Sequence, residues 1–293
     1  MRVKKSRGEI YFQWIVWFIV LITLVAVLYP LYFILIASVS DPLEVSAGRV
    51  VLFPRGFNLT AYKTILNNPS IWIGLKNTFL YTVVGTSMSV TVTFMGAYAL
   101  SRKKMPGRNA IMFFIIFTMF FNGGLIPTYM QVKNLNLLDT FWIMVLMNLV
   151  SVFHLIVTRS FLQSTIDEQL YDACYIDGGS DFTAFFKIAC PLSKPILAVL
   201  VLVNAVGHWN SYFYALIFLR DRARYPLSLF MREILMQNMS AAEEIMGTDL
   251  TRIYFQESLK YSLIIVSIVP MLILYLFLQK YFKKGIMIGA IKG

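Results

Sequence analysis

Six long apolar runs dominate the chain. They cover residues 13–37, 71–100, 110–131, 140–158, 196–218 and 259–278. A helix needs about 20 mainly apolar residues to cross the hydrocarbon core of a bilayer. The pattern therefore predicts an all-α integral membrane protein with six transmembrane helices. Gly123, Gly124 and Pro127 interrupt the third run, so that span is expected to bend or break there.

Composition supports the membrane assignment. Apolar residues make up 58% of the 293 positions and charged residues 14%, whereas soluble domains carry about 25% charge. A soluble protein of this length has no means of burying so much apolar surface, so lipid must cover part of it. Six spans use about 120 residues, which leaves room for loops but not for a soluble domain. We therefore expect a single transmembrane domain over residues 1–293.

Basic residues mark one side of the membrane. Three short segments hold twelve of the 26 basic residues: Arg2, Lys4, Lys5 and Arg7; Arg102, Lys103, Lys104 and Arg108; and Lys280, Lys283, Lys284 and Lys292. By the positive-inside rule these segments, and with them both termini, are expected in the cytoplasm. The same rule accounts for the net charge of +11, so no nucleic-acid partner is expected. Two long loops, 40–70 and 219–258, fall outside, and 226–235 reads as an amphipathic helix able to touch a soluble partner.

One segment on the predicted inner side is acidic instead. Residues 159–194 hold three basic residues and five acids. Ser164 or Thr165 is expected to cap a first helix, with Ile166, Leu170, Ala173 and Cys174 along one face and Glu168 and Asp172 sharing another. A turn at 177–179 leads to a second helix capped by Ser180 or Asp181 and ended by Pro191 and Pro195. The residues alone leave two readings open: a docking element for a basic cleft on another protein, or a loop lying on the lipid headgroups.

A motif in this segment carries a family resemblance. Asp172-Ala-Cys, Asp177-Gly-Gly, Phe185, Ile188 and Pro191 have the spacing of the "EAA" loop of bacterial importer permeases. The chain departs from that motif by Asp172 for Glu, Cys174 and Gly179 for Ala, and Cys190 for Leu. Residues 121–129, 209–213 and 284–293 also resemble the carbohydrate-uptake branch, in particular the smaller permeases of the maltose, LplC and alginate type. The resemblance covers the chain after Gln13.

The resemblance implies a function in the bacterial inner (plasma) membrane. The chain would be a non-catalytic permease subunit of an ATP-driven oligosaccharide importer, forming half of the translocation pathway. Its partners would be a homologous second permease, two ATP-binding cassette subunits that hold ATP and Mg, an external or periplasmic sugar-binding protein, and membrane lipid. The implied ATPase-docking residues are Glu168, Asp172, Ala173, Asp177, Gly178, Gly179, Phe185 and Pro191. The implied contacts of the C-terminal tail are Gly285, Gly289, Lys292 and Gly293.

Other classes of function lack the residues they need. The chain has no Gly-x4-Gly-Lys-Ser/Thr loop to cradle phosphate, and its two histidines join no cluster of metal ligands. Apolar spans nearly free of ionisable residues disfavour the main alternative, a self-sufficient secondary transporter or channel for a small polar solute. Polar and aromatic residues in the spans would line a sugar pathway or bond helices to one another. These are Asn77, Asn122, Thr128, Asn148, Asn204, His208, Trp209, Asn210 and Tyr212.

Overall fold

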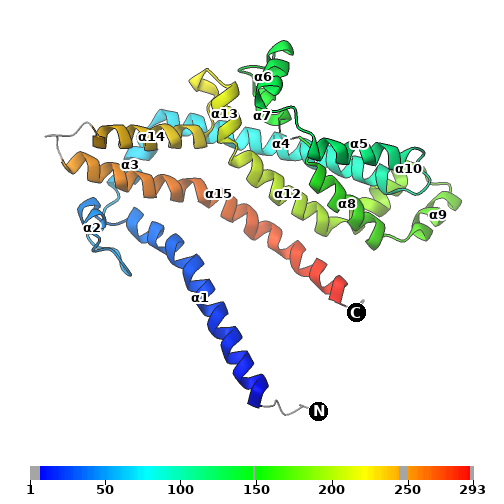
Figure 1. The fold of residues 1–293 in the computed structure, drawn as a ribbon, viewed down its shortest axis with the longest axis horizontal. Helices are drawn as coiled ribbons and strands as arrows, with labels where there is room; N and C mark the ends of the chain where they lie inside the picture. The colour runs from blue at the N-terminus through cyan, green and yellow to red at the C-terminus, as the bar shows by residue number, and fades with distance from the viewer. Residues whose placement is uncertain (1–6, 148, 244–249, 291–293) are drawn as a thin grey trace. The chain divides into compact units, whose positions relative to one another are not determined.

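The computed structural model describes residues 7–147, 149–243 and 250–290, which are helical with no strand in these ranges (Figure 1). The main helices are α1 (Arg7–Ser38), α4 (Pro69–Ser101), α5 (Arg108–Phe120), α6 (Leu125–Asn134), α7 (Phe141–Leu146), α8 (Val152–Thr165), α12 (Lys194–Trp209), α13 (Tyr212–Phe218), α14 (Leu227–Glu243) and α15 (Leu250–Ala290). Shorter helices α2 (Pro42–Ser46) and α3 (Thr60–Asn67) follow α1. The chain divides into two compact units, Met1–Asn68 with Met231–Ile268, and Pro69–Phe230 with Val269–Gly293.

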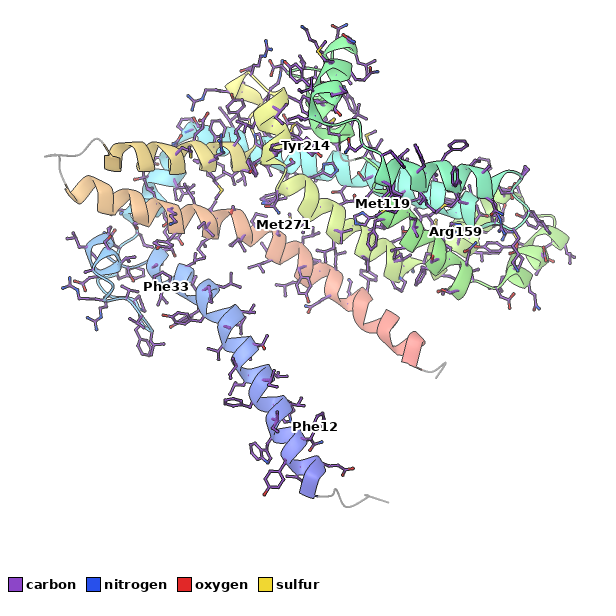
Figure 2. All side chains as sticks on the ribbon, viewed as in Figure 1. Phe12, Phe33, Met119, Arg159, Tyr214 and Met271 are labelled. Atoms are coloured by element: carbon purple, nitrogen blue, oxygen red, sulfur yellow. The ribbon has the colours of Figure 1, made fainter. Side chains whose placement is uncertain are left out.

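The first unit is built on the long apolar helix α1. Its side chains, such as Phe12 in Figure 2, project outward, and most of the helix is exposed in this chain alone. Only its last turns pack: Phe33 meets the Tyr261 ring edge-on at 5.8 Å, and the Ser38 carbonyl accepts a hydrogen bond from Ser262. A helix that is apolar on every side and unburied requires lipid or another subunit around it.

The second unit is organised around α4, which runs beside α8 and α12 (Figure 1). With 33 residues α4 is about 50 Å long, enough to cross the bilayer and project beyond it. Threonines and serines, rather than large aliphatic residues, supply much of its buried face. Small side chains of this kind allow helices to approach closely in a membrane, where packing rather than the hydrophobic effect holds helices together.

Three of the six predicted spans are single long apolar helices: Gly8–Ser38, Pro69–Ser101 and Ser258–Tyr281. The third span is broken as expected, since α5 and α6 meet at 115° across the Gly123-Gly124 segment. The prediction of one helix over 140–158 is wrong: α7 ends at Leu146 and α8 begins at Val152 with Ser151 as its cap. The fifth run also divides, because α12 ends at Trp209 and α13 starts at Tyr212.

The contact between α4 and α12 depends on Gly85. The imidazole of His208, 1% exposed, lies against this glycine, and a Cβ built at Gly85 would lie 2.6 Å from the ring. Ser89 lies one turn further along α4, with its hydroxyl 3.3 Å from His208 Nε2. His208 therefore bonds two helices together, and any side chain at position 85 would force them apart.

The N-terminal part of α4 holds the segment that precedes α14. Asn77 donates hydrogen bonds to the carbonyls of Ala223 and Tyr225, Tyr81 donates to Arg224, and Thr78 accepts from the Leu227 amide. The predicted amphipathic helix over 226–235 is confirmed as the start of α14.

Asp139 completes this cluster at the N-terminal part of α4. Its carboxylate accepts from the amides of Arg220 and Asp221 and lies 2.9 Å from Arg224 Nη1. Burial alone would raise the pKa of Asp139, but the two amides and the guanidinium outweigh burial and lower that pKa. The loop 219–226 is therefore fixed to both α4 and the α6–α7 connection.

We expect Gly85→Ala to lower the melting temperature of the detergent-purified chain. The added methyl would overlap the His208 ring, and overpacking of this kind costs about 1–3 kcal/mol. Gly207→Ala is the matched control, because this glycine is also helical but has no atom within 4 Å of its Cβ position. Equal melting temperatures for the two variants would contradict the close contact.

Candidate functional site

The acidic segment forms a helical hairpin after α8. It contains α9 (Glu168–Ile176), α10 (Asp181–Thr183), the π-helix η1 (Ala184–Ala189) and α11 (Cys190–Leu192). Together, residues 167–192 are called the hairpin below. The two halves are joined by a hydrogen bond of 2.6 Å from the Tyr175 hydroxyl to Asp181 Oδ1.

The ends of these helices differ in part from the prediction. Ser164 and Thr165 do not cap α9, because α8 continues through them; the cap is Asp167, whose carboxylate accepts from the Gln169 amide. Ser180 is confirmed as the second cap, with its hydroxyl accepting from Thr183. Pro191 does not end a helix, since α11 continues to Leu192 before the chain bends by 79° into α12.

The turn of the hairpin needs two glycines for different reasons. Gly178 has φ +78°, a left-handed conformation that side chains rarely adopt, but nothing crowds it. Gly179 has an ordinary φ, but a Cβ there would lie 2.5 Å from Cys174 Sγ and 2.8 Å from the Cys174 carbonyl oxygen. Its amide donates to that carbonyl at 2.8 Å, which closes the end of α9.

Aromatic side chains join the hairpin to the last turns of α4. Phe185 packs on Phe94 and Tyr98, with ring centroids 5.5 Å and 5.0 Å apart, and Tyr171 lies 6.0 Å from Tyr98. Tyr171 is 3% exposed, so the buried face of α9 centres on it. The predicted face is only partly correct, since Ile166 is buried but Leu170 and Ala173 are exposed.

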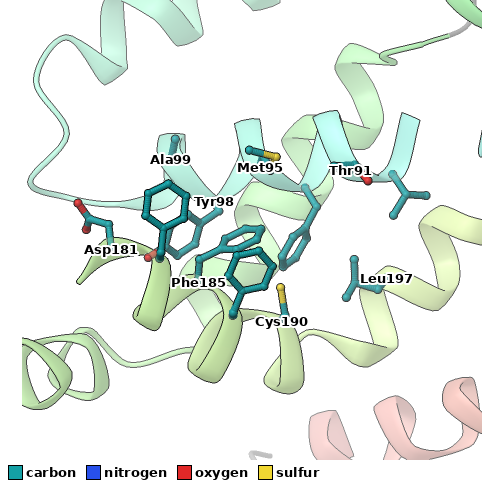
Figure 3. A pocket seen from close by; sticks show the side chains of 12 residues that line it. Thr91, Met95, Tyr98, Ala99, Asp181, Phe185, Cys190 and Leu197 are labelled. Atoms are coloured by element: carbon teal, nitrogen blue, oxygen red, sulfur yellow. The ribbon is translucent and has the colours of Figure 1, made fainter. Parts of the chain in front are cut away.

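An apolar pocket of about 440 Å³ lies beside these rings (Figure 3). Met95, Tyr98 and Ala99 of α4 form one wall, and Phe185 and Cys190 form the opposite one. Asp181 is the only acidic group among its lining residues.

The loop after α4 forms two ion pairs with α9. Arg102 Nη1 lies 3.2 Å from Glu168 Oε1, and Lys104 Nζ lies 2.8 Å from Asp172 Oδ1. The hydrogen bond to Asp172 raises the pKa of Lys104, and the same bond lowers the pKa of Asp172. The predicted common face of Glu168 and Asp172 is confirmed, and it faces this basic loop.

The far side of the hairpin is open. Ile176 at the end of α9 is 86% exposed, whereas Phe182, 74% exposed, lines the apolar pocket beside α4. Ala173, Asp177 and Pro191 are exposed as well. The eight docking candidates therefore separate into three sets. Glu168, Asp172 and Phe185 make contacts within the chain; Ala173, Asp177, Gly178 and Pro191 lie on the open side, and Gly179 is half-buried in the turn.

The polar candidates for the pathway also separate by burial. Asn77 binds loop 219–226, Asn204 donates to the Leu200 carbonyl of its own helix, and His208 and Trp209 are at most 6% exposed. These four side chains make hydrogen bonds or packing contacts within the chain. Four others are accessible in this chain: Asn122, Thr128, Asn210 and Tyr212.

The accessible candidates lie at the two helix breaks. Asn122 accepts from the Gly124 amide between α5 and α6, and Asn210 follows the last residue of α12. The structure does not bring the two breaks into one site within the described residues. Asn148, Lys292 and Gly293 lie outside the described residues, and no side-chain surroundings are described at Gly285 and Gly289 of α15.

Comparison with known proteins shows the family to which this chain belongs. Residues 93–288 match the family described as "Binding-protein-dependent transport system inner membrane component". Protein LplC of Bacillus subtilis is 36% identical, with 90% of this chain and 89% of LplC covered. The polygalacturonan/rhamnogalacturonan transport permease YtcP of the same organism is 35% identical, with 94% and 96% covered. A chain of a crystal structure of a bacterial ABC transporter that imports the acidic polysaccharide alginate aligns at a TM-score of 0.85 and 32% identity, covering 96% of this chain and 99% of that one.

The chain therefore belongs to the family of binding-protein-dependent inner-membrane transport components. It is a permease subunit of an ABC importer with the all-α fold of that family, and it is a non-catalytic subunit. The resemblance found in the sequence is confirmed at the level of the family.

Sequence reasoning missed three residues that hold the hairpin: Arg102, Lys104 and Tyr171. In the sequence the first two residues indicate only orientation, and their pairing with Glu168 and Asp172, more than sixty residues away, has no local signal.

The two turn glycines are predicted to fail differently on substitution. Gly178→Asn should be tolerated, since asparagine enters the left-handed region at low cost, whereas Gly178→Val should lower the thermal stability of the hairpin by about 1–2 kcal/mol. Gly179→Asn should destabilise the hairpin as much as Gly179→Ala, because the Cβ that both residues add would clash with the Cys174 carbonyl oxygen. Trypsin cleavage at Lys187 in purified protein measures the opening of the hairpin. Equal sensitivity of Gly178→Asn and Gly179→Asn would contradict these roles.

Proposed function

We propose that this chain is one of two homologous but different permease subunits of an ATP-driven oligosaccharide importer in a bacterial inner membrane. Two ATPase subunits bind on the cytoplasmic side and hold ATP and Mg. An external binding protein delivers the sugar. The family membership of the chain supports the general composition of this complex, and the hairpin supports the docking arrangement.

The hairpin's open side is the observation that carries the proposal. Ile176 exposes its apolar side chain at the end of α9, while the hairpin's own contacts, through Tyr171 and Phe185, are made with α4. Exposed apolar groups beside a defined acidic turn are typical of a protein interface rather than of a solvated loop.

The mechanism follows the line of contacts along α4. ATP binding closes the two ATPase subunits and displaces the docked hairpin. The aromatic contacts at Phe94 and Tyr98 pass this displacement to the end of α4, whose other end holds the outer loop through Asn77 and Tyr81. A rigid helix held at both ends turns a movement on one side into opening on the other, as alternating access requires.

The topology has both termini in the cytoplasm and loop 219–226 outside. The basic loop at 102–104 and the hairpin, which are separate in sequence, meet at one end of α4. The outer loop meets the other end of α4. The opposite placement of the two loops supports the orientation that the positive-inside rule gives.

Asn122, Thr128, Asn210 and Tyr212 are the groups of this chain that we assign to the sugar pathway. Amide and hydroxyl groups bind sugar hydroxyls, and an aromatic face stacks on a sugar ring. YtcP is named as a permease for polygalacturonan/rhamnogalacturonan, and the alginate transporter imports an acidic polysaccharide, so the substrate test includes both uronic and neutral oligosaccharides. ATPase activity of the assembled complex with binding protein, stimulated by one of these classes, identifies the substrate class.

Cysteine labelling tests the topology. In a variant lacking Cys174 and Cys190, Lys103→Cys should react with an impermeant maleimide only after the membrane is opened, and Ala223→Cys should react in intact cells. Both positions are exposed, so access depends on the side of the membrane alone. Labelling of Lys103→Cys in intact cells would overturn the orientation.

Ile176→Asp tests docking. We expect a tenfold or greater loss of ATPase subunits recovered with the chain from detergent, equivalent to about 1.4 kcal/mol, because a charge replaces an apolar contact. Phe57→Asp is the control, being 74% exposed but in loop 40–70. Recovery of the partner permease should be unchanged in both. Normal ATPase recovery with Ile176→Asp would remove the hairpin tip from the interface.

A further inference from the structure

The loop that follows α1 folds back on that helix. Val45 and Val50 are buried with Ile36 and Ala37 of α1 in a small apolar cluster, against which Phe33 also packs. The chain therefore leaves the end of α1 and returns to the side of the same helix, instead of extending away from it (Figure 1).

Backbone contacts close the base of this loop. The Asp41 amide donates to the Arg55 carbonyl at 2.9 Å, and the Arg55 amide donates to the Ser40 hydroxyl at 3.2 Å. Gly56 follows with φ +61°, and a Cβ there would lie 2.8 Å from the Asp41 Cβ. Residues 49–54, called the tip below, therefore belong to a compact loop whose two ends lie together.

Two tyrosines of α1 bind the backbone of the tip. The Tyr29 hydroxyl donates to the Val51 carbonyl at 3.2 Å, and the Tyr32 hydroxyl donates to the Leu52 carbonyl. Tyr32 lies about 9 Å along the helix before the end of α1 at Ser38. The tip is thus held beside the last turns of an apolar helix, and its carbonyls have donors that do not depend on water, as a membrane requires.

Aromatic residues mark the depth at which α1 crosses the bilayer. Tyr11, Trp14 and Trp17 near its start are exposed, as are Tyr29 and Tyr32 near its end. Trp and Tyr concentrate at the two interfaces of a membrane with water. Trp14 and Tyr32 are about 27 Å apart along the helix, close to the roughly 30 Å thickness of the hydrocarbon core. This spacing puts Tyr32, and the tip that it binds, at the boundary between hydrocarbon and headgroups.

The tip exposes apolar side chains at this boundary. Residues 51–53, which are Val, Leu and Phe, are each more than half exposed. Arg49 on one side of them is paired with Glu44 at 2.6 Å, whereas Arg55 on the other side is exposed and available to a phosphate. Apolar side chains next to a cation are typical of a segment that lies in the membrane interface, where the apolar groups enter the acyl region and the cation meets lipid phosphate.

We infer that the tip is a lipid anchor, whose apolar side chains at 51–53 enter the leaflet at the C-terminal end of α1 while Arg55 contacts lipid phosphate. Tyr29 and Tyr32 hold the tip at that depth. With 32 residues α1 is longer than the hydrocarbon core is thick, and an anchor of this kind limits how far such a helix tilts or slides. The inference goes beyond the proposed function, because it needs only that α1 crosses a membrane.

A fluorescent label at position 53 reports what surrounds the tip. In the assembled importer lacking Cys174 and Cys190, Phe53→Cys is labelled with a nitrobenzoxadiazole dye in nanodiscs of phosphatidylethanolamine and phosphatidylglycerol. Lipid that carries a nitroxide near its headgroup should quench the emission at least twofold. The quenching constant for iodide in water should be at least fivefold lower than at Lys63→Cys, the control, which is an exposed position in the same loop 40–70.

The other possible occupants of this surface give different results. An iodide quenching constant at position 53 equal to that at position 63 would put the tip in water, open to the external binding protein, and would overturn the inference. Quenching by neither agent would show that protein covers the tip. That result would assign the tip to the interface with the partner permease and would equally overturn the inference.

The two tyrosines are tested by removal of their hydroxyls. With the label at position 53, the double variant Tyr29→Phe, Tyr32→Phe should raise the iodide quenching constant at least threefold, because two tip carbonyls lose their donors and turn to water. Phenylalanine keeps both rings, so α1 itself is unchanged. Tyr11→Phe is the matched control, since this tyrosine is exposed at the opposite end of α1. An unchanged quenching constant in the double variant would overturn the role of the tyrosines in holding the anchor.

Discussion

The structure of the second unit depends on the close approach of α4 to α12 at Gly85. The missing side chain there admits the imidazole of His208, which bonds across to Ser89 and excludes any larger residue. In a bilayer, lipid tails solvate apolar side chains as well as a protein core does, so tight fit and buried polar contacts must supply the stability that burial supplies in water. Once α4 is fixed in this way, both of its ends become fixed points to which loops attach.

Some residues of the hairpin make contacts within the chain, and others are exposed. Tyr171, Phe185, Glu168 and Asp172 contact α4 and its loop, while Ile176 and Asp177 at the turn are exposed. The contacts that hold the hairpin combine aromatic stacking with charge. Because contacts within the chain already hold the hairpin on α4 before any partner binds, the hairpin moves as a unit.

Sequence predicted the all-α membrane class, the hairpin and its turn because each depends on local patterns: apolar run length, caps and glycines. It also predicted the break in the third span, where Gly123-Gly124 precludes a regular helix. It missed the break between α7 and α8, since the apolar run 140–158 contains no proline or glycine and its signal is a single capping residue, Ser151. The burial of Asn204 and His208 could not be predicted either. A polar residue in a span can bond a neighbouring helix or line a pathway, and both roles fit the same position in the sequence. The partners of Glu168 and Asp172 lie more than sixty residues away, beyond any local pattern.

The break after α5 has a consequence for how cells make this protein. With 13 residues from Arg108 to Phe120, α5 is about 20 Å long, so the irregular backbone at 121–124 falls inside a hydrocarbon layer about 30 Å thick. Peptide groups at that depth require protein or water around them, yet these residues are exposed in the chain alone. A subunit synthesised without its companion would carry this exposed backbone as a mark of incomplete assembly. The backbone at 121–124 therefore needs protein or water around it before the subunit is stable in the membrane.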